Sequence, residues 1–318
     1  MNTVARRTCL ALLALYGAYT GLWGYVAPQS WYRGFPGLGL HWLPRFGPLN
    51  EHFAKDLNAL ALGLAVLAIA ALCWIGTRSL TYLTGSTWLT FNGLHLIFHL
   101  QHLDMLGATD RIAGVVALVL VVVLAALLLI PLRGTASGEG GRPRILDRVV
   151  FAVLFVFGGA TGGWAYFAPG NWYSTFPGFG RSWLPQLGPF NEHLAVDVGA
   201  AFLAYAVLSL IALVRAGDVR VVRTTGLAWL VFNVLHLSYH LTMLGMYDRS
   251  DQVLNVIGLS AAVVLPVIVL FRKKEVGERG SHVNRTQSGT PAAAGRVGAG
   301  SRRVQGVDAP GDGDQEGR

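Results

Sequence analysis

Eight apolar segments, each near the ~20 residues that a helix needs to cross a bilayer, constrain this chain more than any other feature. Helices are the simplest way to cross, because in hydrocarbon every backbone polar group must be bonded internally. The composition agrees, since 53% of residues are hydrophobic and 13% are charged. We therefore predict an all-α polytopic membrane protein in contact with the lipid bilayer, with spans at about 8–27, 52–75, 86–105, 111–132, 149–168, 193–214, 227–246 and 252–271.

Basic residues fall in every second loop, which predicts that both termini of this multi-pass cell-membrane protein are cytoplasmic. They are Arg6, Arg7, Arg78, Arg133, Arg142, Arg144, Arg148, Arg215, Arg220, Arg223, Arg272, Lys273 and Lys274. Because these cations orient the chain, its formal charge of +8 is not evidence for a nucleic-acid partner. The first span resembles a signal peptide, but its counterpart in the second half is internal, so we expect it to remain uncleaved.

A tandem repeat relates the two halves, because adding 141 to a residue number carries one half onto the other without a gap. Residues 28–56 match their counterparts at 17 of 29 positions, against 7 of 19 for residues 57–75. Each half holds an even number of spans, so we predict two parallel four-helix bundles side by side. The expected divisions are 1–135 and 149–274 for the membrane units, 136–148 for a cytoplasmic linker, and 275–318 for a disordered cytoplasmic tail.

The segment that is most similar between the two halves is the polar start of a helix, together with the aromatic, Pro-rich loop before it. The loops 28–50 and 169–191 either anchor the protein at the membrane interface or fold as lids over an outward-facing cavity. Asn50 is suited to cap the second span, and Glu51 stands where a helix N-terminus favours negative charge. Asn191 and Glu192 repeat this pattern in the second half.

Histidine and aspartate side chains extend the polar pattern into the spans. His52 and Asp56 share one helix face, and His95 and His99 share a face of the next span together with Asn92. If that span ends near Met105, His99 lies ~9 Å below the outer surface, at a depth comparable to that of Asp56. We therefore expect each half to hold its own polar site. The second-half residues are His193, Asp197, Asn233, His236 and His240.

Three imidazoles and a carboxylate form a donor set that suits zinc, and also iron or copper. Haem ligated by histidine and a quinone or proton relay are further readings, and ordinary bonds between helices are the structural alternative. His102 has Met243 as its counterpart, so we leave His102 and His41 out of any site. No nucleotide fingerprint or nucleophile motif is present, and glycines such as Gly158 and Gly162 are expected to allow close helix contact.

Four-span units with a Pro-rich first loop and a polar start to the second helix resemble the DoxX-like superfamily of small bacterial membrane proteins. The resemblance covers each half separately and implies a membrane redox partner, but it assigns no site residue. The residues alone leave three function classes open. These are a metal or redox protein, a transporter that relays protons through the same histidines, and a membrane scaffold whose polar residues are structural.

Overall fold

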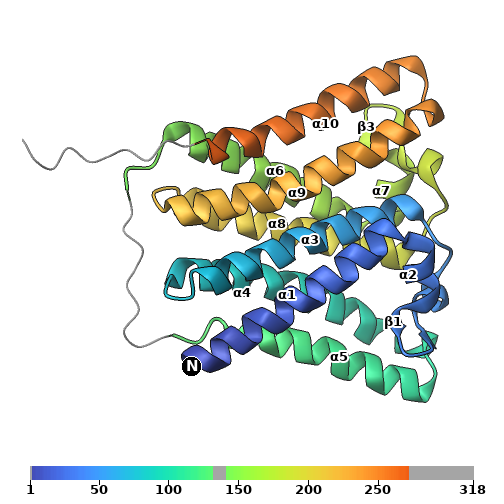
Figure 1. The fold of residues 1–318 in the computed structure, drawn as a ribbon. Helices are drawn as coiled ribbons and strands as arrows, with labels where there is room; N and C mark the ends of the chain where they lie inside the picture. The colour runs from blue at the N-terminus through green and yellow to red at the C-terminus, as the bar shows by residue number, and fades with distance from the viewer. Residues whose placement is uncertain (1, 132–140, 272–318) are drawn as a thin grey trace, which may run out of the picture. The chain divides into compact units, whose positions relative to one another are not determined.

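The computed structural model describes residues 2–131 and 141–271, and it is helical as predicted. The expected tail and residues 136–140 of the expected linker lie outside these residues, and the last part of that linker, 145–148, belongs to the helix that starts at Ile145. The helices are α1 Thr3–Val26, α2 Pro28–Gly34, α3 Glu51–Cys73, α4 Arg78–Gln101, α5 Ala108–Leu127, α6 Ile145–Phe167, α7 Pro169–Thr175, α8 Glu192–Val214, α9 Val219–Met243 and α10 Arg249–Leu270. The two short helices, α2 and α7, stand at equivalent places in the two halves (Figure 1).

Seven of the long helices in the described part of the chain are long and apolar enough to cross a membrane. The remaining long helix, α4, has 24 residues but is rich in Ser, Thr, Asn and His, which lowers its hydropathy. Both α4 and α9 begin eight residues before the predicted spans, at Arg78 and Val219. The prediction from hydropathy left out these first turns because they contain polar residues. The start of α9 is nevertheless capped, since the side chain of Asp218 accepts from the backbone amides of Arg220 and Val221.

The central helices are α3 and α8, which are apolar and small-residue-rich on nearly every face. In the apolar 18-residue stretch of each helix, 67% of the residues are buried in α3 and 78% in α8, against 11% in α5 and 17% in α10. A helix that is apolar all round belongs inside a bundle, whereas the exposed apolar faces of α5 and α10 are suited to lipid. Each central helix packs closely on the preceding long helix, α3 on α1 and α8 on α6.

Glycine permits the closest of these helix contacts, as the sequence predicted. A Cβ atom added to Gly162 of α6 would lie 2.6 Å from the backbone nitrogen of Leu203 and 2.8 Å from the carbonyl oxygen of Gly199. One at Gly158 would lie 3.1 Å from the carbonyl oxygen of Phe202. Larger residues at these positions would therefore push α6 away from α8.

The long helices of each half contact one another, and the two halves also pack against each other. Across the halves, α3 packs on α9 and α4 packs on α8, and α3 also contacts α8. The described helices belong to one compact unit rather than to two. The repeat in the sequence indicates which segments correspond, but it carries no signal for the contacts between the halves, and the division into two four-helix units stays a prediction.

Each segment between the first two long helices of a half folds into a small structured element. After α2, the strands β1 (Pro36–Gly37) and β2 (Leu40–His41) form an antiparallel hairpin, followed by the 3-10 helix η1 (Leu43–Phe46). The second half repeats this order with β3 (Pro177–Gly178), β4 (Arg181–Ser182) and η3 (Leu184–Leu187). Both segments lie at the same end of the long helices, at the right of Figure 1.

Candidate metal sites

Two buried groups of histidine and aspartate form at the end of the helices that carries the hairpins. We call His52, Asp56, His236 and His240 cluster A, and His95, His99, His193 and Asp197 cluster B. In each cluster the three histidines offer ring nitrogens that lie within 4.8 Å of one another. All eight ionisable residues predicted from the sequence therefore belong to one cluster or the other.

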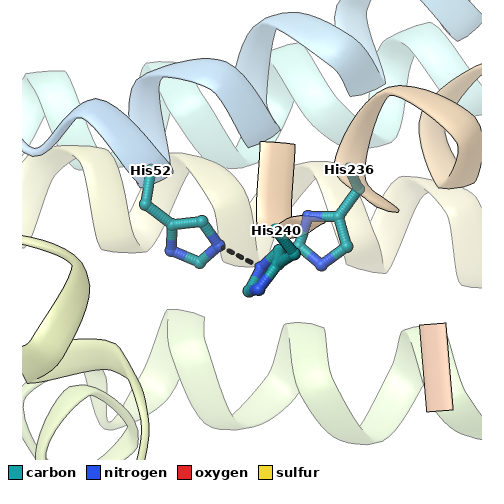
Figure 2. A group of neighbouring side chains, drawn as sticks. All are labelled: His52, His236 and His240. Atoms are coloured by element: carbon teal, nitrogen blue, oxygen red, sulfur yellow. Dashed lines mark hydrogen bonds between the residues drawn. The ribbon is translucent and has the colours of Figure 1, made fainter. Parts of the chain in front are cut away.

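Cluster A joins α3 to α9 (Figure 2). The Nε2 atom of His52 lies 3.0 Å from Nε2 of His240 and 3.1 Å from Oδ2 of Asp56. The other carboxylate oxygen, Oδ1 of Asp56, lies 2.6 Å from Nδ1 of His236. His52, Asp56 and His240 are each at most 5% exposed, so the cluster is shielded from solvent.

Cluster B joins α8 to α4 with nearly the same geometry. The Nε2 atom of His193 lies 3.1 Å from Nε2 of His99 and 3.2 Å from Oδ2 of Asp197. Oδ1 of Asp197 lies 2.5 Å from Nδ1 of His95. His193 and Asp197 are buried, while His95 and His99 are half-buried.

Both clusters are built from opposite halves, which corrects the expected pairing. The sequence led us to place the His52–Asp56 pair against His95 and His99, and the His193–Asp197 pair against His236 and His240. The structure pairs each with the other half's histidines, because α3 packs on α9 and α8 on α4. The depth argument changes too, since α4 ends at Gln101 and His99 stands in its last turn.

The asparagine caps also cross between the halves. Asn50 accepts from the backbone amide of Phe53, as predicted for a cap, and its Nδ2 donates to the carbonyl oxygen of Pro189 at 2.9 Å. Asn191 accepts from Leu194 and donates to Pro48 at 2.7 Å. These reciprocal bonds hold the start of α3 against the loop before α8, and the start of α8 against the loop before α3.

The other polar residues singled out from the sequence lie outside the clusters. Glu51 faces Lys55 at 3.9 Å, and Glu192 is exposed. Asn92 donates to the carbonyl oxygen of Trp88 in its own helix, whereas Asn233 donates to that of Ala262 in α10. His41 is exposed and His102 stacks on Phe98, so both stand apart from the clusters, in agreement with the prediction.

A cavity adjoins each cluster, and the hairpin segments form part of its wall. Cavity B, beside cluster B, has a volume of about 280 Å³, and cavity A, beside cluster A, about 210 Å³. Trp31 and Trp42 line cavity B, and their counterparts Trp172 and Trp183 line cavity A. These loops, residues 28–50 and 169–191, therefore contribute to the walls of the cavities; we call them the lids, and that they close over an outward-facing cavity stays a prediction.

Sequence reasoning missed the residues that surround the clusters. Tyr239 stacks on the ring of His52 at 5.7 Å between centroids, and its counterpart Phe98 stacks on His193 at 5.4 Å. Tyr247 and Asn255, both buried, line cavity A. Phe98 and Tyr239 are aromatic residues at equivalent positions of the repeat, directly before His99 and His240, so the sequence could have indicated that they lie beside the clusters. Tyr247 and Asn255 have no such signal, because their counterparts are Leu106 and Gly114.

Comparisons with protein-family models, with curated proteins and with solved structures each gave no match. The resemblance to the DoxX-like superfamily therefore stays a prediction. What the structure itself defines is a helical protein with apolar helices of membrane-spanning length and two buried His/Asp clusters. Its function has to be argued from the chemistry of those clusters.

Proposed function

We propose that the chain is an integral membrane protein with two transition-metal centres, one in each cluster. The observation that carries this proposal is the position of the Nε2 atom of His52. That atom lies within 3.1 Å of both a carboxylate oxygen and a second imidazole nitrogen, and His193 repeats the arrangement within 3.2 Å. A ring nitrogen carries either one proton or one lone pair, so it cannot make a full hydrogen bond to both neighbours. A cation between these groups satisfies all of them.

The carboxylate has a second role in this arrangement. Asp56 binds the Nδ1 side of His236, which fixes the ring and leaves its Nε2 atom for an ion. Metal-binding histidines commonly have such a carboxylate partner, which orients the ring and raises its basicity. Asp197 stands in the same relation to His95. The proposed ligands are therefore three imidazoles and the second carboxylate oxygen in each cluster, Oδ2 of Asp56 in one and Oδ2 of Asp197 in the other.

The donor set narrows the choice of ion and of cofactor. Imidazole suits zinc, copper, iron and nickel, whereas calcium and magnesium prefer oxygen ligands. Haem takes its axial ligands from opposite faces of the ring, and two Nε2 atoms only 3.0 Å apart leave no space for a porphyrin between them. A single first-row transition ion in each cluster fits best.

Metal analysis of the purified full-length protein tests this proposal. We expect two equivalents of one transition metal per chain after exposure to the metal and removal of the excess. His41→Ala and His102→Ala are matched controls, because each removes a histidine outside the clusters, and both should keep two equivalents. Protein that holds no transition metal under these conditions would refute the proposal.

A proton relay is the second candidate, and one observation favours it. In cluster A the contacts run without a break from His236 through Asp56 and His52 to His240, and such chains of titratable groups mark proton pathways in membranes. The metal count separates the two functions. A relay would leave the clusters metal-free, while replacing Asp56 would still abolish proton movement in vesicles.

The membrane orientation is part of the same proposal. The alternating basic loops place both termini in the cytoplasm of a cell whose plasma membrane holds all eight long helices, α4 included. The clusters then lie toward the outer leaflet. A tag at the C-terminus should react with a reagent only after the cells are opened. A tag that reacts in intact cells would reverse the orientation.

A further inference from the structure

Cavity B is built to hold a ligand with an apolar body. It is lined by residues of α1, α2, α3, α4, α5 and α8 and of the segment that follows α2. Aromatic and aliphatic side chains make up most of its wall, and the aromatic ones include Trp31, Phe35, Trp42, Phe46 and Phe91. Its volume of about 280 Å³ is close to the lower end of the roughly 300–1,000 Å³ typical of small-molecule sites. Aromatic walls of this kind favour a ligand that itself contains an aromatic ring.

The polar side of cavity B is cluster B. The other polar side chains of the wall include Asn58 and Thr20, which donate to carbonyl oxygens of their own helices, those of Ala54 and Tyr16. The imidazoles and the one carboxylate of the wall therefore lie in a single place, while the indole N–H groups of Trp31 and Trp42, which have no hydrogen-bond partner among the described residues, offer two further donors. Asp197 is 1% exposed and would repel an anionic ligand, so a neutral hydroxyl group, which both donates and accepts, fits better.

Cavity A is the smaller of the two, at about 210 Å³ against about 280 Å³, and three positions of its wall carry a bulkier side chain than their counterparts. Phe202 stands where cavity B has Ala61, Tyr247 stands in place of Leu106, and Asn255 stands in place of Gly114. Each replacement is larger or more polar than its counterpart. The clusters correspond closely and both cavities have aromatic side chains in their walls, but cavity B is the larger and has Leu106 and Gly114 where Tyr247 and Asn255 line cavity A.

We propose that cavity B, and not cavity A, binds a small aromatic alcohol, with its ring against the aromatic wall and its hydroxyl group at cluster B. The proposal deepens the proposed function, because it places a phenol-type substrate or ligand beside one of the two ions. It does not depend on the ion alone, since Asp197 and the imidazoles can bond a hydroxyl group directly.

Equilibrium binding of naphthol to the purified full-length protein tests the proposal, with naphthalene as the comparison ligand. We expect one site per chain for naphthol and clearly weaker binding of naphthalene, which lacks the hydroxyl group. Gly114→Leu should weaken naphthol binding about tenfold or more, because the new side chain occupies the cavity. A Cβ atom at Gly114 meets only Leu106, at 3.7 Å, so the variant should fold.

Gly258→Leu is the matched control, because Gly258 lines cavity A and an added Cβ atom meets nothing within 4 Å. This variant should bind naphthol as the unchanged protein does. Because it is measured in the same detergent, it also controls for naphthol that is taken up by the detergent. Equal loss in both variants, or equal binding of naphthol and naphthalene, would overturn the proposal. Metal counts on the same samples separate the two proposals, since Gly114→Leu should keep both ions. Suppose that the protein holds no metal, still binds naphthol and loses that binding in Gly114→Leu. The metal centres would then be refuted, and the cavity proposal would stand.

Discussion

Clusters A and B differ little in their internal geometry and much in their surroundings. The contact between the aspartate and the first histidine of the His-x3-His pair is 2.6 Å in one and 2.5 Å in the other, and the contacts between Nε2 atoms are 3.0 and 3.1 Å. Around them, Tyr239 replaces Phe98 on the stacked face, and the cavity walls have diverged. The donor atoms of the two clusters therefore correspond, while the pockets beside them differ in size and lining.

The lids differ in the same way. In the second half Arg181 of β4 pairs with Asp251 at the start of α10 and also reaches Ser250. The position equivalent to Arg181 is Leu40, which cannot pair with Asp110, so the lid of cavity B lacks this tie. The lid of cavity B is attached to α1 instead, because the Tyr19 hydroxyl donates to the carbonyl oxygen of Pro36 at 3.3 Å and the counterpart of Tyr19 is Ala160.

The largest single-residue effect should follow from the aspartates. Asp56→Asn keeps the shape of the side chain but removes its charge, so the affinity of cluster A for its ion should fall about 10- to 100-fold, as for other carboxylate partners of metal-binding histidines. Cluster B should be unchanged, and Asp197→Asn should show the reverse pattern. Competition with a chelator measures both affinities. Equal weakening of both sites by either variant would contradict the assignment of one aspartate to each cluster.

The asparagine caps should give the next largest effect. Asn50→Ala removes a helix cap, worth about 1 kcal/mol, together with the bond to Pro189. Asn191→Ala removes the corresponding pair, so the two variants should lower the free energy of unfolding by similar amounts. Thermal unfolding in detergent measures this. A loss confined to one variant would show that the crossed caps are not equivalent.

The helices, and the ionisable residues that gather in the two clusters, could be predicted from the sequence for a physical reason. Apolar length determines a spanning helix, and ionisable residues inside such a helix are rare enough to stand out. His52 and Asp56 could be placed on one face because helical spacing is local. The partner of that face could not be predicted, because choosing α9 over α4 depends on packing between helices far apart in the chain. Pocket residues such as Tyr247 and Asn255 escaped for the same reason.

The smallest effect should come from the lid of cavity A. Arg181→Leu recreates the first-half residue and removes a partly exposed ion pair, which is worth about 0–1 kcal/mol. Global stability should hardly change, but amide hydrogen exchange in residues 176–184 should rise toward that of residues 35–43. Exchange that stays slow would show that other contacts hold this lid closed, and the contrast between the lids would then lie elsewhere.

The central claim is that each metal site is shared between the two halves, and paired alanine variants test it most directly. In the structure His52 belongs with His240, so His52→Ala combined with His240→Ala should destroy one site and leave one ion per chain. His52→Ala combined with His99→Ala removes a ligand from each cluster and should leave none. Metal analysis of the two double variants would contradict the account if the result were reversed, with one ion kept when His52 and His99 are replaced and none when His52 and His240 are replaced.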